Sequence, residues 1–335
     1  MGSGALILLS TDAQNLYWMS RYLERAGHIS RLLVSQFDLI HDHPTGDIEK
    51  GWLRIYNTLG RIPAGANLMP IQEDNFVMLL DAYTLVGDLT FEPENPDAII
   101  GLFEKARENA RQIRNILSHE IWSTLNVSYL EMNNTRLRDI WRAHPQDFFV
   151  KSSVAVRTFC GIAYATMYRD HSWYFFRLGQ QVERIQLTCA LLGSHVRLFP
   201  TDDPLWGIHW SGLLEICVAR SAFRRLHSVE YQPSKIIDFL VGDSRLANSV
   251  SHGLSEIQKT LEIISGSTDT GYTSEAEWHI GKTRSLIEYN WPVRDKSDDS
   301  SLQKILKQIS TGVIEIDNQI NKAYFNYPIQ NTSGT

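Results

Sequence analysis

Apolar residues recur at steps of three and four positions along almost the whole chain, while alternating, strand-like runs are scarce. The clearest helix start is Asn95-Pro96-Asp97, an N-cap residue followed by a proline and an acid in the first turn. One apolar stripe continues from there and predicts a single long helix, through Phe103, Ala106, Ala110, Ile113, Leu117 and Ile121. Only 11 of the 335 residues are proline, and most lie between periodic segments. The sequence therefore predicts an all-α protein.

The other periodic segments predict further helices at 12–40, 47–59, 71–88, 146–169, 172–198, 205–227, 245–265, 273–290 and 301–323. Linkers rich in Pro, Gly, Asp or Ser lie at 61–70, 90–97, 198–204 and 291–301, and none is long enough to be a flexible tether between domains. We therefore expect one elongated multi-helix bundle over residues 10–325. Residues 1–9 are interpreted as an N-terminal extension that begins like an expression-vector remnant, and residues 326–335 as a disordered tail.

Composition excludes several classes of function. The net charge of −6 disfavours general binding to nucleic acid. The apolar run at 5–9 is too short to span a membrane and follows no basic leader. The three cysteines lack metal-site or redox spacing and are expected to be buried free thiols of a cytoplasmic protein.

The sequence also lacks the motifs of the common cofactor sites. It contains no Glu-x-x-His, which di-iron helical bundles require on two helices. It contains no glycine-rich phosphate loop and no Gly-x-Ser-x-Gly elbow. We expect neither a metal nor another cofactor.

Charged residues gather on one face of the helix predicted at 12–40. In the segment WMSRYLERAGHISRLL, Arg21, Glu24, Arg25 and His28 lie opposite an apolar stripe and are spaced so that their side chains can touch. A solvated surface with weak ion pairs within the helix would account for such a face.

A second Glu-Arg pair argues for buried charge instead. MSRYLERAGHISRLL (19–33) aligns without gaps to LGQQVERIQLTCALL (178–192), which is a faint sign of an internal duplication. The second helix is apolar nearly all round, so Glu183 and Arg184 are expected to be buried. Adjacent residues point about 100° apart on a helix, so each needs a partner on another helix.

Arginines at 107, 111 and 114 form a stripe beside the apolar face of the segment ARENARQIRNILSHEIWSTLN (106–126). Such guanidinium groups can fork onto carboxylates of a neighbouring helix. We therefore hypothesise a polar layer within the bundle, in which arginines of other helices hold Glu24 and Glu183.

These same segments resemble the Alpha-E domain, a bacterial all-helical family named for its Glu-Arg motif. SAFRRLH (221–227) and KIIDFLVGDSRLANSV (235–250) resemble its later part, and the resemblance covers residues 10–325. The family usually has glycine at the position of Ser20 and arginine at that of Gln180. The candidate residues of the layer, including those that match the family's motifs, are Arg21, Glu24, Arg25, His28, Arg107, Glu108, Asn109, Arg111, Arg114, Glu183 and Arg184.

The resemblance implies a context more than a reaction. Alpha-E proteins accompany ATP-grasp ligases, which join carboxylates to amines, and transglutaminase-like proteins. We therefore expect a noncatalytic partner of such a ligase, with an Arg/Glu-lined site that docks the enzyme or an acidic small molecule or peptide. Two alternatives remain: an enzyme with Glu24, His28 and Glu183 as acid-base groups, or charges that are purely structural.

Overall fold

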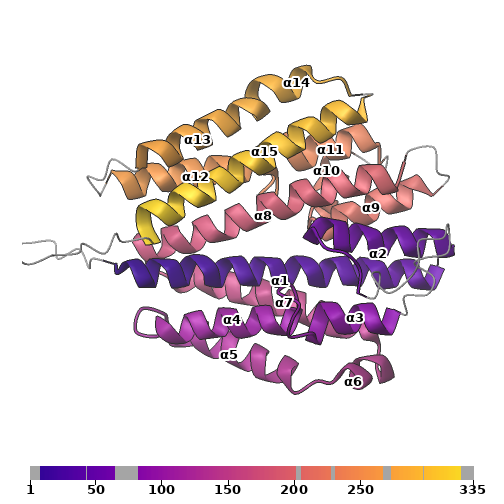
Figure 1. The fold of residues 1–335 in the computed structure, drawn as a ribbon, viewed down its shortest axis with the longest axis horizontal. Coiled ribbons are helices and arrows are strands. Elements are labelled where there is room, and N and C mark those ends of the chain that lie inside the picture. Colours follow the sequence, from indigo (N-terminus) through magenta and orange to yellow (C-terminus); the bar gives the residue numbers. More distant parts are fainter. Residues whose placement is uncertain are drawn as a thin grey trace, which may run out of the picture.

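The computed structural model describes residues 8–42, 44–64, 82–200, 205–227, 231–266, 273–296 and 298–325. Every regular element in these ranges is a helix, which confirms the all-α prediction (Figure 1). Most of the helix predicted at 71–88, and the tail predicted at 326–335, lie outside the described residues. None of the described helices combines the length and the apolar character needed to cross a bilayer.

Two long helices, α1 (Ser10–Asp42) and α8 (His171–Leu198), lie side by side at the centre of the molecule (Figure 1). They run parallel, because the hydrogen bonds between them join residues 158 to 165 positions apart in the chain. Their backbones approach closely at Gly179, where a Cβ atom would lie 2.2 Å from the carbonyl oxygen of Tyr17. Glycine at this position is what allows the two helices to pack at this distance.

Most of the remaining helices form two groups, one on each side of the central pair, except that α2 lies beside α8 and apart from the other helices of the first half (Figure 1). Those of the first half of the chain are α2 (Thr45–Leu59), α3 (Ala82–Phe91), α4 (Ile99–Gln112), α5 (His119–Asn133), α6 (Leu137–Arg142) and α7 (Pro145–Thr166). Those of the second half are α9 (Trp206–Ile216), α10 (Arg220–His227), α11 (Pro233–Gly242), α12 (Val250–Ser265), α13 (Thr273–Ser285), η2 (Leu286–Asn290), α14 (Trp291–Val293), α15 (Asp299–Ile320) and η3 (Asn321–Phe325).

The packing of the first half is repeated in the second. Helices α4 and α7 pack on α1, and α5 packs against both of them. In the same way, α12 and α15 pack on α8, and α13 packs against both. The short helix after each long one packs on the other long helix, α2 on α8 and α9 on α1. The fold is therefore an internal duplication, stronger than the sequence echo suggested. The tetrapeptide Leu-Val-Gly-Asp at both 85–88 and 240–243, within or next to α3 and α11, agrees with it.

Two of the predicted helices are wrong in extent. The single helix expected from Asp97 through Ile121 ends at Gln112, and α5 begins at His119 after the N-cap Ser118, whose hydroxyl accepts the Ile121 N–H. The turn lets both stretches bury apolar side chains as a hairpin. The helix predicted at 205–227 divides into α9 and α10.

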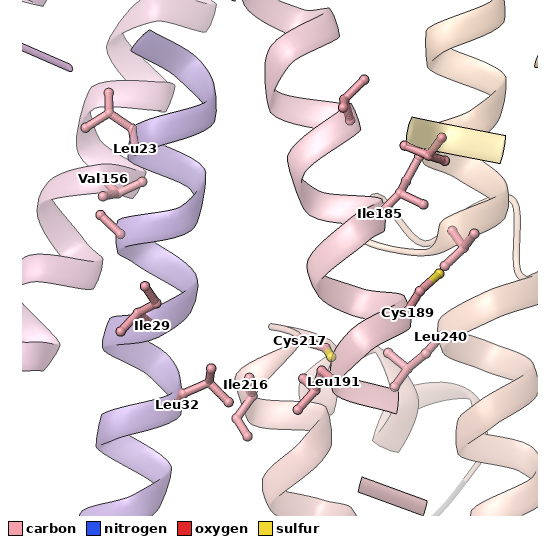
Figure 2. Packing of buried hydrophobic residues seen from close by; sticks show 14 of the residues in the cluster. Leu23, Ile29, Leu32, Val156, Ile185, Cys189, Leu191, Ile216, Cys217 and Leu240 are labelled. Atoms are coloured by element: carbon pink, nitrogen blue, oxygen red, sulfur yellow. The ribbon is translucent and has the colours of Figure 1, made fainter. Parts of the chain in front are cut away.

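The core is continuous across both halves. Figure 2 shows Leu23 of α1 beside Val156 of α7, and Leu32 of α1 facing Ile216 of α9. α9, which belongs to the second half of the chain, thus packs against the C-terminal part of α1.

Candidate functional site

The two Glu-Arg pairs meet between α1 and α8 and bind each other reciprocally. Arg184 donates from Nε and Nη2 to the two carboxylate oxygens of Glu24, at 2.9 and 2.8 Å. Arg25 donates from Nε to Oε1 of Glu183 at 2.5 Å. Because the helices are parallel and in register, each glutamate faces the arginine of the other pair and not its own neighbour.

The surroundings of Glu183 form a complete ionic network, which we call the closed site: Arg21, Arg25, Asp97, Glu183 and Asp317. Arg21 donates to Glu183 at 2.8 Å and to Asp317 of α15 at 2.6 Å. Arg25 donates a second bond, to Asp97 before α4, at 2.6 Å. Glu183 is 1% exposed and has both oxygens engaged.

Burial and charge are balanced in the closed site. Burial alone would lower the pKa of Arg21, but the charge of Glu183 and other negative groups raises it. Tyr17 donates its hydroxyl to Asp317 at 2.7 Å, and burial raises its pKa. Each guanidinium thus bonds two carboxylates, and truncating one partner would leave buried charge unpaired.

The surroundings of Glu24 are built from different residues at the equivalent positions. Gln180 lies three residues before Glu183, as Arg21 lies three before Glu24. Its amide donates to the thiol of Cys160 on α7 at 3.4 Å, where Arg21 donates to Asp317 on α15. The duplication therefore substitutes an amide and a thiol for an ion pair.

A third position also differs. Asp97 precedes Ala98, the N-cap of α4, and Asn248 precedes Ser249, the N-cap of α12. Arg25 donates to Asp97, whereas Nη1 of Arg184 finds only the carbonyl of Ala247, at 3.4 Å. The carboxylate of the first copy has become an amide in the second.

A cavity of about 160 Å³ opens beside Glu24; we call it the open pocket. It is lined by Glu24, His28, Arg31, Val156, Arg157, Cys160, Gln180, Arg184, Thr188, Cys217, Val218 and Asn248. A second cavity of about 160 Å³, the adjoining pocket, shares Arg31, Arg157 and Val218 with it. A ligand can extend from one cavity to the other.

The open pocket carries more cationic than anionic charge. Its only carboxylate is Glu24, and Arg184 already engages both oxygens of that group. Within the ranges that the structure describes, neither Arg31 nor Arg157 forms an ion pair; Arg31 donates to the carbonyl of Ile216 at 2.7 Å. Burial lowers the pKa of Arg31. The arrangement suits an anion, because Arg31, whose guanidinium is oriented by the Ile216 carbonyl, and the exposed Arg157 both lack a carboxylate partner.

His28 and Glu24 are tuned away from proton transfer near neutral pH. Burial, with the charge of Arg31, lowers the pKa of His28 to about 3, so the ring is neutral. Burial acts to raise the pKa of Glu24, but the charge and hydrogen bonds of Arg184 lower it to about 2. Nε2 of His28 is buried without a hydrogen-bond partner among the described residues, and His28 lines the pocket.

The turn between α9 and α10 forms one wall of the pocket. Val218 has φ 55°, and among the described residues it is alone in combining a side chain with positive φ. A β-branched residue in this conformation is strained, and strain of this kind clusters at binding sites. The turn is held by Arg31 on Ile216 and by Asn248, which donates to the carbonyl of Cys217 at 3.1 Å.

Five residues predicted for the polar layer lie elsewhere: Arg107, Glu108, Asn109, Arg111 and Arg114. The prediction that Arg107, Arg111 and Arg114 hold Glu24 and Glu183 is wrong, because arginines of α1 and α8 themselves bond these glutamates. Glu108 and Asn109 also lie outside the layer. The salt bridge of Arg111 to Glu108 is exposed, and Asn109 is only partly buried.

The guanidinium groups of this face contact aromatic rings. Arg107 donates to Asn126 at 2.7 Å and lies over Trp122 and Tyr129, and Arg114 also lies over Trp122.

The structure does bring the other predicted residues together: Arg21, Glu24, Arg25, His28, Glu183 and Arg184. Sequence reasoning missed Asp97, Arg157, Val218, Asn248 and Asp317, because none of them lies in either Glu-Arg segment and no local pattern marks them. No group of three metal-binding side chains occurs in the described part of the chain.

The fold and the crossed pairs define a class of duplicated, all-helical proteins in which two Glu-Arg dipeptides bind each other. The chain belongs to the Alpha-E family, described as a predicted alpha-helical domain with a conserved ER motif, and the match covers residues 8–325.

Relatives of the chain include uncharacterized proteins of Mycobacterium bovis and of two strains of Mycobacterium tuberculosis. Each is 23% identical over 269 residues, which is 76% of this chain and 30% of the relative. The chain thus spans under a third of the length of the curated relatives it matches. No solved structure matches it.

Proposed function

We propose that this protein is a noncatalytic partner of an ATP-grasp-type ligase that joins carboxylates to amines, and that the open pocket binds an acidic small molecule or peptide of that system. The observation that carries the proposal is the charge of the pocket: Arg31 and Arg157 lack a carboxylate, while Arg184 saturates Glu24. The guanidinium of Arg31 is already oriented by the Ile216 carbonyl before a ligand arrives, which reduces the cost of binding.

The ligase and a transglutaminase-like protein are proposed as partners on the strength of the family resemblance. A cytoplasmic location agrees with the three free cysteines, Cys160, Cys189 and Cys217.

A catalytic role for Glu24, His28 and Glu183 has less support. A general acid or base works best when its pKa lies near the operating pH. The pKa of Glu24 is about 2 and that of His28 about 3. Glu183 is sealed, and both of its oxygens are engaged by arginines. Binding is therefore the better proposal.

The test measures ATP-dependent amide formation by the ligase encoded with this chain, with and without the purified chain. We expect turnover to rise several-fold with the chain present, and the chain alone to consume no substrate. Arg157→Gln, in the pocket, should abolish the stimulation. Arg111→Gln, which removes an exposed cation from α4, is the matched control and should leave it unchanged. Equal turnover with and without the chain would contradict the partnership.

A further inference from the structure

The closed site shows how this fold satisfies a Glu-Arg pair when nothing else binds. Arg25 bonds two carboxylates there, that of Glu183 and that of Asp97. Arg184 occupies the equivalent place in the other copy and has one carboxylate, that of Glu24. The two halves thus provide an internal comparison, in which one copy lacks an acidic group that the other contains.

The missing group would lie where Asn248 stands. The amide of Asn248 turns to the carbonyl of Cys217, so it does not bond Arg184. Nη1 of Arg184 is left with the carbonyl of Ala247 at 3.4 Å, longer than the 2.6 Å bond from Arg25 to Asp97. This nitrogen lies at the pocket that Arg31 and Arg157 also line.

The adjoining pocket indicates what the rest of the ligand is like. Its walls are mainly apolar and include Val34, Val150 and Ile216 besides the shared Val218. Two carboxylates also line it, Asp38, which accepts from Gln146, and Glu215, which accepts from Arg220. Apolar walls next to an arginine cluster suit a carbon chain that ends in an anion, and free phosphate has no such chain. The side chain of an acidic residue, or a short aliphatic acid, has both parts.

We infer that the ligand of the open pocket presents a carboxylate on an aliphatic chain, and that this carboxylate bonds Arg184 as Asp97 bonds Arg25. The inference rests on the proposed function, because it names the chemical class of the ligand that the pocket takes. The closed site is then a permanently filled version of the open one, with its carboxylates supplied by the chain itself.

The experiment measures binding of three probes by calorimetry: glutarate, its uncharged amide glutaramide, and inorganic phosphate. We expect glutarate to bind at least tenfold more tightly than either of the others. Asn248→Asp should supply the missing carboxylate, weaken glutarate binding at least tenfold and raise the midpoint of thermal unfolding. Asn248→Ala loses the same bond to Cys217 without adding charge and should keep most of the affinity. Ser244→Asp adds the same charge outside the pocket on the same exposed loop and controls for the general field.

The outcomes separate the two proposals. Tighter binding of phosphate, lost in Arg157→Gln, would overturn the carboxylate inference and leave the anion pocket standing. Binding of glutarate that Asn248→Asp leaves unchanged would also overturn it. If no probe binds, or if Arg157→Gln binds all three as well as the natural chain, the open pocket itself is not an anion site and the proposed function fails with it.

Discussion

The closed site and the open pocket begin from the same pair of residues and end with opposite properties. Around Glu183, each guanidinium bonds two carboxylates, and the Glu183 carboxylate itself is buried from solvent. Around Glu24, an amide, a thiol and a second amide replace the equivalent arginine and the two aspartates, and a cavity remains. The comparison teaches that two copies of one motif in a duplicated fold can differ in how completely their charges are paired, and that the less completely paired copy borders a cavity.

The energetic reason lies in the cost of burying charge. Taking an ion out of water costs several kcal/mol, and only a complete set of partners offsets it. The closed site meets this condition within the chain. The open pocket meets it in part, because Arg184 bonds one carboxylate where Arg25 bonds two.

The largest expected effect comes from removing the charge of the sealed glutamate. Glu183→Gln should lower the free energy of unfolding by roughly 3–5 kcal/mol, because it leaves both the buried Arg21 and the partly buried Arg25 with one carboxylate fewer. Glu24→Gln, the matched change beside the open pocket, should cost less, since it removes the carboxylate partner of only one arginine, Arg184. Chemical denaturation of both variants checks this, and equal losses would break the comparison between the sites.

The second test rebuilds the closed site in the open copy. Gln180→Arg alone should destabilise the protein by about 2 kcal/mol, because it adds a buried cation near Arg184 and loses the bond that Gln180 accepts from Arg177. Adding Cys160→Asp should recover most of this loss, as the Arg21–Asp317 pair does in the closed site. A double-mutant cycle should therefore give a favourable coupling of about 1–3 kcal/mol.

Gln180→Met is the control for the rebuilt pair, since it changes the side chain without adding charge. Strict additivity of Gln180→Arg and Cys160→Asp would mean that the two halves are not equivalent at these positions.

A smaller effect follows from the neutral histidine of the open pocket. The pKa of His28 is lowered from 6.5 to about 3, so the unfolded chain takes up a proton before the folded one does. Above pH 6.5 the ring is neutral in both the folded and the unfolded chain, so the free energy of unfolding does not change with the protonation of His28. Between pH 6.5 and 3 only the unfolded chain takes up the proton, so the free energy of unfolding falls as the pH falls. His28→Asn should flatten the decline of unfolding free energy by about 1 kcal/mol per pH unit between pH 6 and 5.

His195 is also buried with a lowered pKa, so a residual slope should persist in the His28→Asn protein. His195→Asn serves as the comparison outside the pocket. A decline that is unchanged in His28→Asn would contradict a neutral His28.

The smallest expected effect concerns the strained wall of the pocket. Val218→Gly should raise the unfolding free energy by about 0.5 kcal/mol, because relief of the positive φ slightly exceeds the entropic cost of glycine. Val154→Gly, on the exposed side of α7, should instead lower it by a similar amount. Thermal unfolding distinguishes the two, and a loss above 1 kcal/mol in Val218→Gly would show that the turn is not strained.

Sequence reasoning succeeded where the signal was local. The period of the apolar residues predicted α1, α8 and α15 nearly to their ends. The same period did not reveal the turn at residues 113–118. Apolar residues keep their helical spacing across this turn, because α4 and α5 both bury apolar side chains on either side of it. Sequence reasoning also placed the arginines at 107, 111 and 114 in the wrong site. A helical wheel shows which residues share one face of a helix, but it does not show which other helix that face contacts.

The sequence by itself determined the helical class, and the apolar surroundings of Glu183 showed that this charge needed partners on other helices. The choice of partners was decided only by the tertiary structure, because ion pairs such as those of Arg25 with Asp97 and Arg21 with Asp317 join residues far apart in the chain. Whether the surroundings of a Glu-Arg pair are fully ion-paired or border a cavity depends on three positions: Arg21, Asp97 and Asp317 in one copy, and Gln180, Asn248 and Cys160 in the other. Such contacts follow from how the helices are placed in space, which no local pattern records.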